Sequence, residues 1–462
     1  GVSVFYGLPY AAAPVGERRW RAPAPAPKWT GVRPAKAFGP SCTQNISAKG
    51  WGPWTGEFSP QGEVSEDCLT LTVWAPAHRR GQALPVMVWI PGGGLTDGGE
   101  AVTATNAAEL ARQGVIVVSI NYRVAAFGLL AHPALPADAD GTRGNQAVKD
   151  ALAALIWTHE NASAFGGDPR RITVTGQSAG GALVYVLLAH PRARGLISGA
   201  IIQSFPPGGE RLPDAAAEVE AGKGFARILG APGREGLSAA PAKAVLAASE
   251  DAGLNLHVDG VNIRDAGFAA VRDLAPVPVM IGVTADEASW LKPNLKSHLK
   301  AAETYGPEYL RLYPAANDAQ ALDAALQADR EANLVGLNRW RAARAKAAGG
   351  TTFVYLWDHW LPGPNAALYR AFHSSEVPYM FGSLSLIPGR TFTEADRQIA
   401  RRMMRYWANF VRTGDPNGGG LPAWPRMSVM RLGDGFGPLA PLRPEAEALF
   451  NAYDDRTGTF VF

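Results

Sequence analysis

The sequence predicts an α/β protein built on a mainly parallel, twisted central sheet flanked by helices. Two observations carry this prediction: short, continuously apolar, β-branched runs recur along the chain, and segments with helical spacing of apolar residues lie between them. Continuously apolar runs are typical of strands buried on both faces, and their alternation with helices is typical of a parallel sheet. The expected strands are residues 69–76, 84–91, 114–123, 171–178, 199–205, 276–284 and 351–358.

Helical patterns fill the intervals between these runs. They cover residues 106–114, 144–165 and 180–190. Two longer stretches, about 206–275 and 290–348, break the alternation with Ala-rich helical segments and turn residues. We therefore expect a single domain over residues 1–462, in which both stretches are helical insertions that cover one end of the sheet.

The composition disfavours several classes of protein. The chain has 462 residues, 47% hydrophobic and 18% charged, which suits a globular fold with many loops. A net charge of +3 with scattered Lys and Arg indicates neither nucleic acid nor an anionic membrane as partner. No apolar run reaches the roughly 18 residues of a membrane span. The chain starts inside a strand-like run, so we expect a leader to have preceded Gly1.

A glycine-rich loop follows the second expected strand, in the stretch VMVWIPGGGLTDGG at residues 86–99. Such a loop binds a phosphate, a dinucleotide or another group through its exposed amides. The stretch has neither the Gly-Lys-Ser/Thr ending of a phosphate-binding loop nor a G-x-G-x-x-G run that opens a helix. Nucleotide binding is therefore disfavoured, and the amides are left for a different ligand.

A second glycine motif lies in ITVTGQSAGGALVY, residues 172–185, where a strand, a Gly-x-Ser-x-Gly turn and a helix follow one another directly. This succession is typical of a nucleophile elbow. Gly176 and Gly180 are needed there because a serine on so tight a turn leaves no room for neighbouring side chains. The helix N-terminus also favours negative charge at Ser178. The alternative is a tight turn with a structural serine.

A serine nucleophile requires a base and an acid that orients the base, in the chain order serine, acid, histidine. Histidines follow Ser178 at positions 190, 257, 298, 359 and 373. We expect His190, at the end of the elbow helix, and His298, in a charged segment, to be exposed, while His257 precedes the expected acid. His359 is expected at the edge of the last strand, packed or on the surface. Position therefore favours His373, which lies on a loop beyond that strand.

The acid is expected at the end of strand 276–284, since open α/β sheets place their sites at strand ends. Asp286 and Glu287 lie there side by side in the stretch MIGVTADEASW. Their positions alone do not separate the two carboxylates.

Seven further stretches, in order along the chain, carry a resemblance. They are GLPYAAAPVGERRWRAPAPAPKWTGVRPAKAFGPSC, SEDCLTLTVWAP, INYRVAAFGLL, GNQAVKDALAALIWTHENASAFGGDPRRITVTGQSAGG, GVTADEASW, AFHSSEVPYMFG and YWANFVRTGDPN. Together they resemble the type-B carboxylesterases, the cholinesterase-like branch of the α/β-hydrolases, and SEDCL and the long block ending at the elbow are the most specific. The resemblance implies an α/β-hydrolase fold with helical insertions over the active-site end.

The resemblance also implies a catalytic set. The nucleophile falls on Ser178, the acid on Glu287 rather than Asp286, and the base on His373. No cofactor or metal is implied.

Further implied residues surround this set. The oxyanion donors fall on the amides of Gly93, Gly94 and Ala179, so the glycine-rich loop within residues 86–99 becomes part of the site. Ser204 resembles a serine that lies near the acid in this family.

Structural pairs follow from the same resemblance. Composition alone leaves the two cysteines either free or bridged, whereas the family pattern pairs them. The implied pairs are the disulfide Cys42–Cys68 and the ion pairs Arg19–Glu66 and Arg123–Asp168. A disulfide favours an oxidising compartment, and we therefore expect a secreted or periplasmic protein, with a bacterial source suggested by the Ala, Arg and Pro bias.

Two positions depart from the family pattern. Pro91 stands where a histidine or an aromatic residue usually precedes the glycines, and Leu95 stands where phenylalanine is common. Pro91 donates no backbone hydrogen bond, so we expect the loop to be held in another way. We expect these changes to alter specificity; the alternative is a damaged oxyanion hole.

The sequence thus predicts a carboxylic ester hydrolase that works through a Ser-His-Glu triad and an acyl-enzyme on a small-molecule substrate, a bulky xenobiotic or natural-product ester. The alternatives are a lipase, thioesterase or amidase on the same site, and a non-catalytic binding protein of cholinesterase type. The sequence does not indicate an oligomeric state.

Overall fold

A ten-stranded sheet forms the centre of the computed structural model, which describes residues 1–47, 49–77, 83–207, 212–265 and 271–457. Its spatial order is β1-β4-β6-β5-β7-β8-β9-β10-β11-β12. The strands are β1 (Val2–Pro9), β4 (Thr70–Pro76), β5 (Leu84–Ile90), β6 (Ile116–Ile120), β7 (Gly167–Gln177), β8 (Gly199–Gln203), β9 (Val279–Thr284), β10 (Thr352–Trp357), β11 (Val429–Leu432) and β12 (Gly437–Pro438). A separate two-stranded sheet joins β2 (Ser41–Cys42) to β3 (Val64–Ser65).

The strand pairing is parallel from β6 to β11, while the pairs β1–β4, β4–β6 and β11–β12 are antiparallel. The prediction of a mainly parallel sheet is therefore confirmed, and each of the seven expected strands is present. The central strands are buried along their whole length, as their apolar sequences require. Because consecutive parallel strands end at one edge of the sheet, the loops after β5, β7, β9 and β10 meet there.

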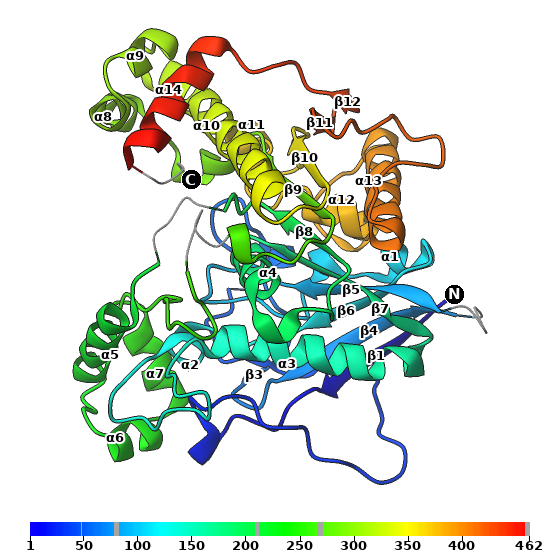
Figure 1. Cartoon of the computed structure of the whole chain (residues 1–462), viewed down its shortest axis with the longest axis vertical. Helices are drawn as coiled ribbons and strands as arrows, with labels where there is room; N and C mark the ends of the chain where they lie inside the picture. Colours follow the sequence, from blue (N-terminus) through cyan, green and yellow to red (C-terminus); the bar gives the residue numbers. More distant parts are fainter. Residues whose placement is uncertain (48, 78–82, 208–211, 266–270, 458–462) are drawn as a thin grey trace.

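Helices cover both faces of the sheet. They are α1 (Ala108–Arg112), α2 (Ala125–Leu129), α3 (Gln146–Asn161), α4 (Ala179–Ala189), α11 (Ala366–Tyr369), α12 (Val377–Phe381) and α13 (Glu394–Thr413). Helices α3 and α4 pack on one another and on β7, whereas α13 packs on β5 and β7 beside α12. Figure 1 shows α3 running along the sheet at the opposite side from the C-terminal helices.

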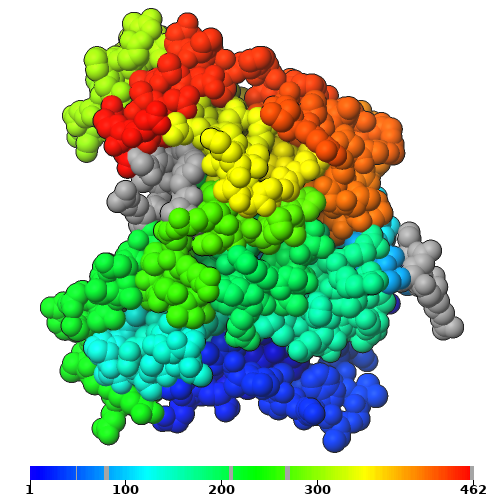
Figure 2. All heavy atoms as spheres, viewed as in Figure 1, coloured from blue at the N-terminus to red at the C-terminus, as the bar shows by residue number. Residues whose placement is uncertain are grey.

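The two expected insertions are helical and occupy different places. The first contains α5 (Ala215–Ile228), α6 (Arg234–Ala239) and α7 (Ala242–Ser249), while the second contains α8 (Leu295–Tyr305), α9 (Glu308–Leu312) and α10 (Asp318–Ala347). The first packs on α2 through an apolar cluster that includes Phe127 and Phe225. The second packs with the C-terminal α14 (Pro444–Thr457). Figure 1 places them far apart, and in Figure 2 the C-terminal part of the chain, coloured yellow to red, forms the upper part of the visible face.

Candidate active site

The predicted nucleophile lies in the turn between β7 and α4. Ser178 has φ 56° and ψ −127°, a backbone conformation that a residue with a side chain adopts only under strain. Its amide donates to the carbonyl of Gln203 on the neighbouring strand at 2.8 Å, and its carbonyl accepts from Ala182 at 3.0 Å. These two hydrogen bonds hold the strained residue at the N-terminus of α4.

The glycines on either side of Ser178 fit the steric argument made from the sequence. A Cβ on Gly176 would collide with the carbonyl of Gly180, and a Cβ on Gly180 would collide with the carbonyl of Ile90 in β5. The turn is tight because the elbow passes directly over the end of the adjacent strand.

The predicted base and acid are in contact. Nδ1 of His373 lies 2.5 Å from Oε2 of Glu287, and the other carboxylate oxygen accepts from the amide of Thr284 at 2.7 Å. Glu287 opens the short 3₁₀ helix that follows β9. Asp286 points elsewhere: it accepts from the amide of Ala371 at 3.2 Å and pairs with Arg330 at 3.3 Å.

The remaining ring nitrogen of His373 contacts the residue before the elbow serine. The side-chain amide nitrogen Nε2 of Gln177 lies 3.1 Å from Nε2 of His373. An amide N–H donates only to an unprotonated ring nitrogen, so this contact fits the tautomer with its proton on Nδ1, toward Glu287. Nε2 then carries the lone pair that a base needs.

Charge around His373 sets its protonation. Burial lowers the pKa of His373, but the charge and hydrogen bond of Glu287 outweigh burial and raise the pKa above its ordinary 6.5. Glu376, three residues along the chain, adds to this effect. That carboxyl is fully buried, accepts from Gln203 at 2.9 Å, and has its own pKa raised to about 7 by burial and by the charge of Glu287. Sequence reasoning missed Glu376, although it lies within the AFHSSE stretch.

The glycine loop after β5 runs beside the elbow. Gly93 and Gly94 have φ of 116° and 60°, which favour glycine. The carbonyl of Gly93 accepts from the amides of Thr96 and Asp97 at 2.9 and 3.0 Å and closes a tight turn. The loop thereby leaves Gly92, Gly93 and Gly94 along the wall of a cavity that also contains Ser178.

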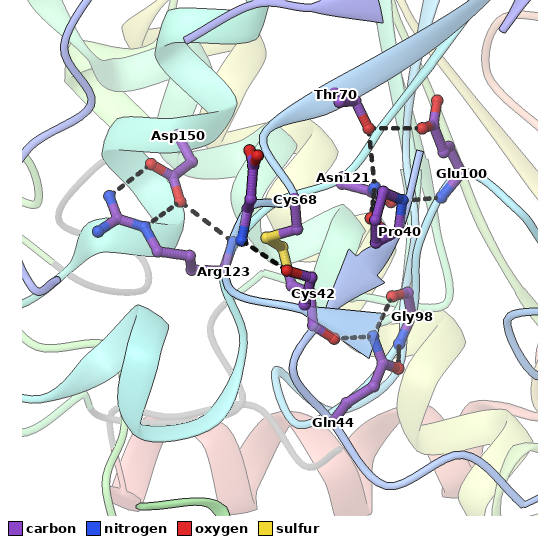
Figure 3. The surroundings of a disulfide bond; sticks show 12 residues. Pro40, Cys42, Gln44, Cys68, Thr70, Gly98, Glu100, Asn121, Arg123 and Asp150 are labelled. Atoms are coloured by element: carbon purple, nitrogen blue, oxygen red, sulfur yellow. Dashed lines mark hydrogen bonds and ion pairs between the residues drawn. A yellow bond between two sulfur atoms is a disulfide. The ribbon is translucent and has the colours of Figure 1, made fainter. Parts of the chain in front are cut away.

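Two side chains hold this loop where Pro91 leaves it without a backbone donor. Tyr122, buried at the end of β6, donates its hydroxyl to the Pro91 carbonyl at 2.9 Å. Gln44 brackets Gly98, donating to its carbonyl and accepting from its amide, each at 2.8 Å. Figure 3 shows that Gln44 extends from Cys42, whose carbonyl it also contacts.

The cavity at this edge of the sheet has a volume of about 800 Å³. Ser178, Glu287 and His373 all line it. Its Trp, Tyr and Phe lining comes from four parts of the chain, namely Trp51, Trp54 and Phe58, then Trp89, then Trp290, Tyr305 and Tyr309, and finally Phe450. Within the described ranges, the second insertion contributes to this lining and residues of 206–275 do not; positions 208–211 and 266–270 of the first insertion are outside those ranges.

Comparison with known proteins agrees with this arrangement. A family model described as the carboxylesterase family matches residues 1–329 and 294–433. The chain belongs to the carboxylesterase family. The fumonisin B1 esterase of Sphingopyxis macrogoltabida is 33% identical over 94% of this chain and 84% of its own length. The human cocaine esterase is 32% identical over 92% and 82%, and the cat carboxylesterase 5A is 32% identical over 92% and 84%. The protein is accordingly a serine hydrolase that acts on carboxylic esters.

The structural pairs expected of a carboxylesterase are present with one correction. The disulfide Cys42–Cys68 and the ion pair Arg19–Glu66 are formed. The predicted pairing of Arg123 with Asp168 is wrong. Arg123 pairs with Asp150 at 2.7 Å, and Asp168 instead contacts Arg170. Arg123 and Asp150 are both buried and face one another (Figure 3), so each requires the other. Asp168 is also buried, but it lies at the start of β7 and contacts Arg170.

Two histidine predictions are also wrong for this carboxylesterase, because neither side chain is exposed. His298 is 1% exposed, contacts the Tyr313 carbonyl at 2.7 Å, and lines the cavity. His190 is 4% exposed and accepts from the amide of Arg192 at the end of α4. His359 lies beyond β10 between Asp396 and Asp434, at 2.9 and 2.5 Å, and is a structural residue.

Two further positions carry no contact that explains a role in specificity or in supporting the acid. Leu95 is buried, with φ 62°, and it is absent from the cavity lining that the described residues form. Ser204 is fully buried, and its hydroxyl has no hydrogen-bond partner among the described residues. The described ranges contain neither a membrane-spanning helix nor a cluster of three metal-binding side chains.

Proposed function

We propose that this carboxylesterase cleaves its substrate through an acyl-enzyme on Ser178. His373 takes the serine proton, Glu287 stabilises the imidazolium, and water activated by His373 then releases the acid. The single observation that carries the proposal is the contact between His373 and Glu287 in the cavity that also contains Ser178.

The oxyanion donors in this proposal are the amides of Gly93, Gly94 and Ala179. Support comes from the positive φ angles of the two glycines and from the position of Ala179 as the first residue of α4. Each donor contributes about 3 to 4 kcal/mol to transition-state stabilisation in enzymes of this kind. The bracing by Tyr122 and Gln44 supports an intact oxyanion hole despite Pro91.

The substrate is a bulky ester in this proposal. A cavity of about 800 Å³ with an aromatic lining accommodates a drug-sized molecule and stabilises it by burying apolar surface. Two of the relatives are named for fumonisin B1 and cocaine. A small acetate would leave much of this surface in contact with water.

Labelling and mutation of the serine test the mechanism. A serine-directed organophosphate should add its mass at Ser178, and Ser178→Ala should lower kcat by roughly 10⁴- to 10⁶-fold with an unchanged far-UV spectrum. Ser204→Ala is the matched control and should retain labelling. Near-normal hydrolysis by Ser178→Ala contradicts the proposal.

A panel of substrates distinguishes ester hydrolysis from thioesterase, amidase and lipase activity. Matched ester, thioester and amide analogues of one bulky acid should show the highest kcat/KM for the ester, and emulsified long-chain triglyceride should be a poor substrate. A preference for the thioester, the amide or the emulsified triglyceride would mean that the main activity is that of a thioesterase, an amidase or a lipase. Labelling without turnover of any analogue would favour a binding protein.

We also propose that the enzyme works in an oxidising compartment, secreted or periplasmic. The Cys42–Cys68 bridge supports this, since such bridges persist where thiols are oxidised. Intact mass after alkylation should show no modified thiol without reductant and two with it. Alkylation of both cysteines in protein isolated from its own source without reductant would contradict this proposal.

A further inference from the structure

An acidic side chain lies inside the oxyanion loop. Asp97 is three residues after Gly94 and lines the same cavity as Ser178. Its carboxyl packs on Gly93, where an added Cβ would collide with Oδ1. The chain thus carries a carboxylate beside one of the amides proposed to stabilise negative charge.

No described residue compensates this carboxylate. Asp97 makes no side-chain hydrogen bond or ion pair with the described residues, although its backbone amide donates to the carbonyl of Gly93. It is partly buried, and burial raises its pKa to about 6. Tyr122 faces it, but the Tyr122 hydroxyl donates to the Pro91 carbonyl. A partly desolvated carboxylate without a partner is unfavourable in the empty enzyme and typical of a ligand-binding position.

The negative charge of Asp97 also opposes the proposed reaction. Negative charge develops on the substrate oxygen near Gly93 and Gly94 in the transition state, and an ionised Asp97 repels it. This repulsion disappears when a positive group lies between or beside the two charges. An ester that brings its own cation therefore gains more in the transition state than an uncharged ester.

The rest of the lining favours a cation as well. Besides Asp97, the carboxyls of Glu287 and Asp329 border the cavity, and the lining formed by the described residues contains no Lys or Arg. The indole rings of Trp51 and Trp54 add aromatic faces, which attract cations. Of these carboxyls, Glu287 is paired with His373 and burial raises the pKa of Asp329 to about 7, so Asp97 is the one expected to repel an anionic substrate most.

We propose that Asp97 is a specificity-determining residue that binds a protonated amine of the substrate, so that the preferred esters carry an ammonium group near the scissile bond. This inference rests on the proposed ester hydrolysis at Ser178. The ammonium donates to the Asp97 carboxylate and at the same time offsets its repulsion of the oxyanion.

Isosteric ester pairs test the inference on both sides of the bond. One pair is 2-(dimethylamino)ethyl and 3-methylbutyl phenylacetate, and the other is ethyl 4-(dimethylamino)butanoate and ethyl 5-methylhexanoate. Within each pair the protonated nitrogen replaces a carbon, so size is constant and charge differs. The kcat/KM values are measured at pH 7.5 for the wild type, Asp97→Asn and Asp434→Asn, the last of which removes the same charge outside the cavity.

The expected result is a change of opposite sign within one pair. Asp97→Asn should lower kcat/KM for the amine ester by about 10- to 100-fold, toward the lower end of what close charge pairs contribute, and raise it severalfold for the carbon isostere. Asp434→Asn should change neither value. The pair that responds identifies whether the amine lies on the alcohol or the acyl side.

Several outcomes overturn the inference, and they differ from failure of the proposed function. Equal amine-to-carbon ratios in wild type and Asp97→Asn, for both pairs, would mean that Asp97 recognises no amine. Organophosphate titration gives the fraction of active enzyme, so a folding defect does not imitate this result. If the wild type hydrolyses all four esters and Ser178→Ala hydrolyses none, the proposed function stands whatever the ratios are.

Discussion

The two sides of the cavity are built in different ways. The catalytic side consists of strand ends and tight turns, where Gly176, Gly180 and Ser178 are fixed by backbone contacts. The opposite side consists of α8 to α10 and the segment around Trp51, where side chains do the lining. A residue that is fixed by backbone contacts tolerates few substitutions, whereas a side chain that lines the cavity can be substituted without moving the backbone. The comparison teaches that chemistry and specificity can vary separately in this fold.

The side chains on the two sides also differ in how exposed they are to solvent. Glu287 is 5% exposed, and His373, the proposed base, lies between the carboxylate of Glu287 and the side-chain amide of Gln177. Trp51 on the opposite side is 58% exposed. Changes on the catalytic side should therefore alter kcat for every ester, while changes on the other side should alter KM for some.

The largest expected effect separates the two adjacent acids. Glu287→Gln should lower kcat by about 10³- to 10⁴-fold, because the amide neither charges nor correctly orients His373. Asp286→Asn is the matched control and should lower kcat less than tenfold, since Asp286 pairs with Arg330. Steady-state kinetics on one ester checks both. A larger loss for Asp286→Asn would reverse the assignment.

A methyl group on the elbow should have the next largest effect. Gly180→Ala should lower kcat by about 100-fold or more, because the added Cβ meets the Ile90 carbonyl and displaces the serine. Gly224→Ala in α5 is the control: it has only Arg227 within reach and should raise the melting temperature slightly. Steady-state kinetics and thermal melts of both variants test this. Equal kcat values for Gly180→Ala and Gly224→Ala would show that the turn accommodates the added methyl group.

The pH profile should report the charge on His373. The base must be neutral, so kcat/KM should fall as pH drops through the pKa of His373, by about tenfold per unit below it. The midpoint should lie above 6.5, since Glu287 raises that pKa. Rates on an uncharged ester between pH 5 and 9 give the midpoint, and residual activity of Glu287→Gln should show a lower one. An unchanged midpoint would mean that Glu287 does not set the basicity.

A smaller effect should come from the brace on the glycine loop. Tyr122→Phe removes the hydroxyl that holds the Pro91 carbonyl and should lower kcat by about fivefold, equivalent to one net hydrogen bond of about 1 kcal/mol. Tyr406→Phe removes a comparable hydrogen bond to the Pro422 carbonyl, away from the loop and the cavity. The control should lower the melting temperature without lowering kcat; similar losses of kcat in both would indicate a general loss of packing.

The smallest effect should appear on the side-chain wall. Trp290→Ala should raise KM a few times for bulky aromatic esters and leave kcat/KM of a small acetate unchanged, since it removes apolar contact only. Trp360→Ala, an exposed tryptophan outside the described lining, is the control. A fall in kcat for the small ester would show that the two sides are coupled.

Much of the fold could be predicted because it follows from local patterns, and the proposed nucleophile could be located in the same way. The seven central strands are continuous apolar runs, and the elbow combines three elements in fourteen residues. The choice between Asp286 and Glu287 could not come from position, since one peptide bond separates them. In the structure Asp286 pairs with Arg330, and Glu287 lies against His373.

What could not be predicted depends on contacts between distant segments. The short strand β11 and the edge strand β12 have too few residues for a pattern. Tyr122 and Gln44 brace the loop from other parts of the chain, and no spacing indicates this. Arg123 and Asp150 are 27 residues apart, and only the position of α3 beside the end of β6 selects this acid over Asp168.

The disulfide has a consequence for producing the enzyme. Cys42 and Cys68 close a loop of 26 residues that carries Trp51 and Trp54, and Gln44 extends from it to the glycine turn. Protein made in a reducing host would keep Ser178 and its partners on the sheet but lose the tie on this loop. Such preparations would combine a normal organophosphate titre with poor discrimination among esters, and batches would differ in selectivity according to how fully they had been oxidised.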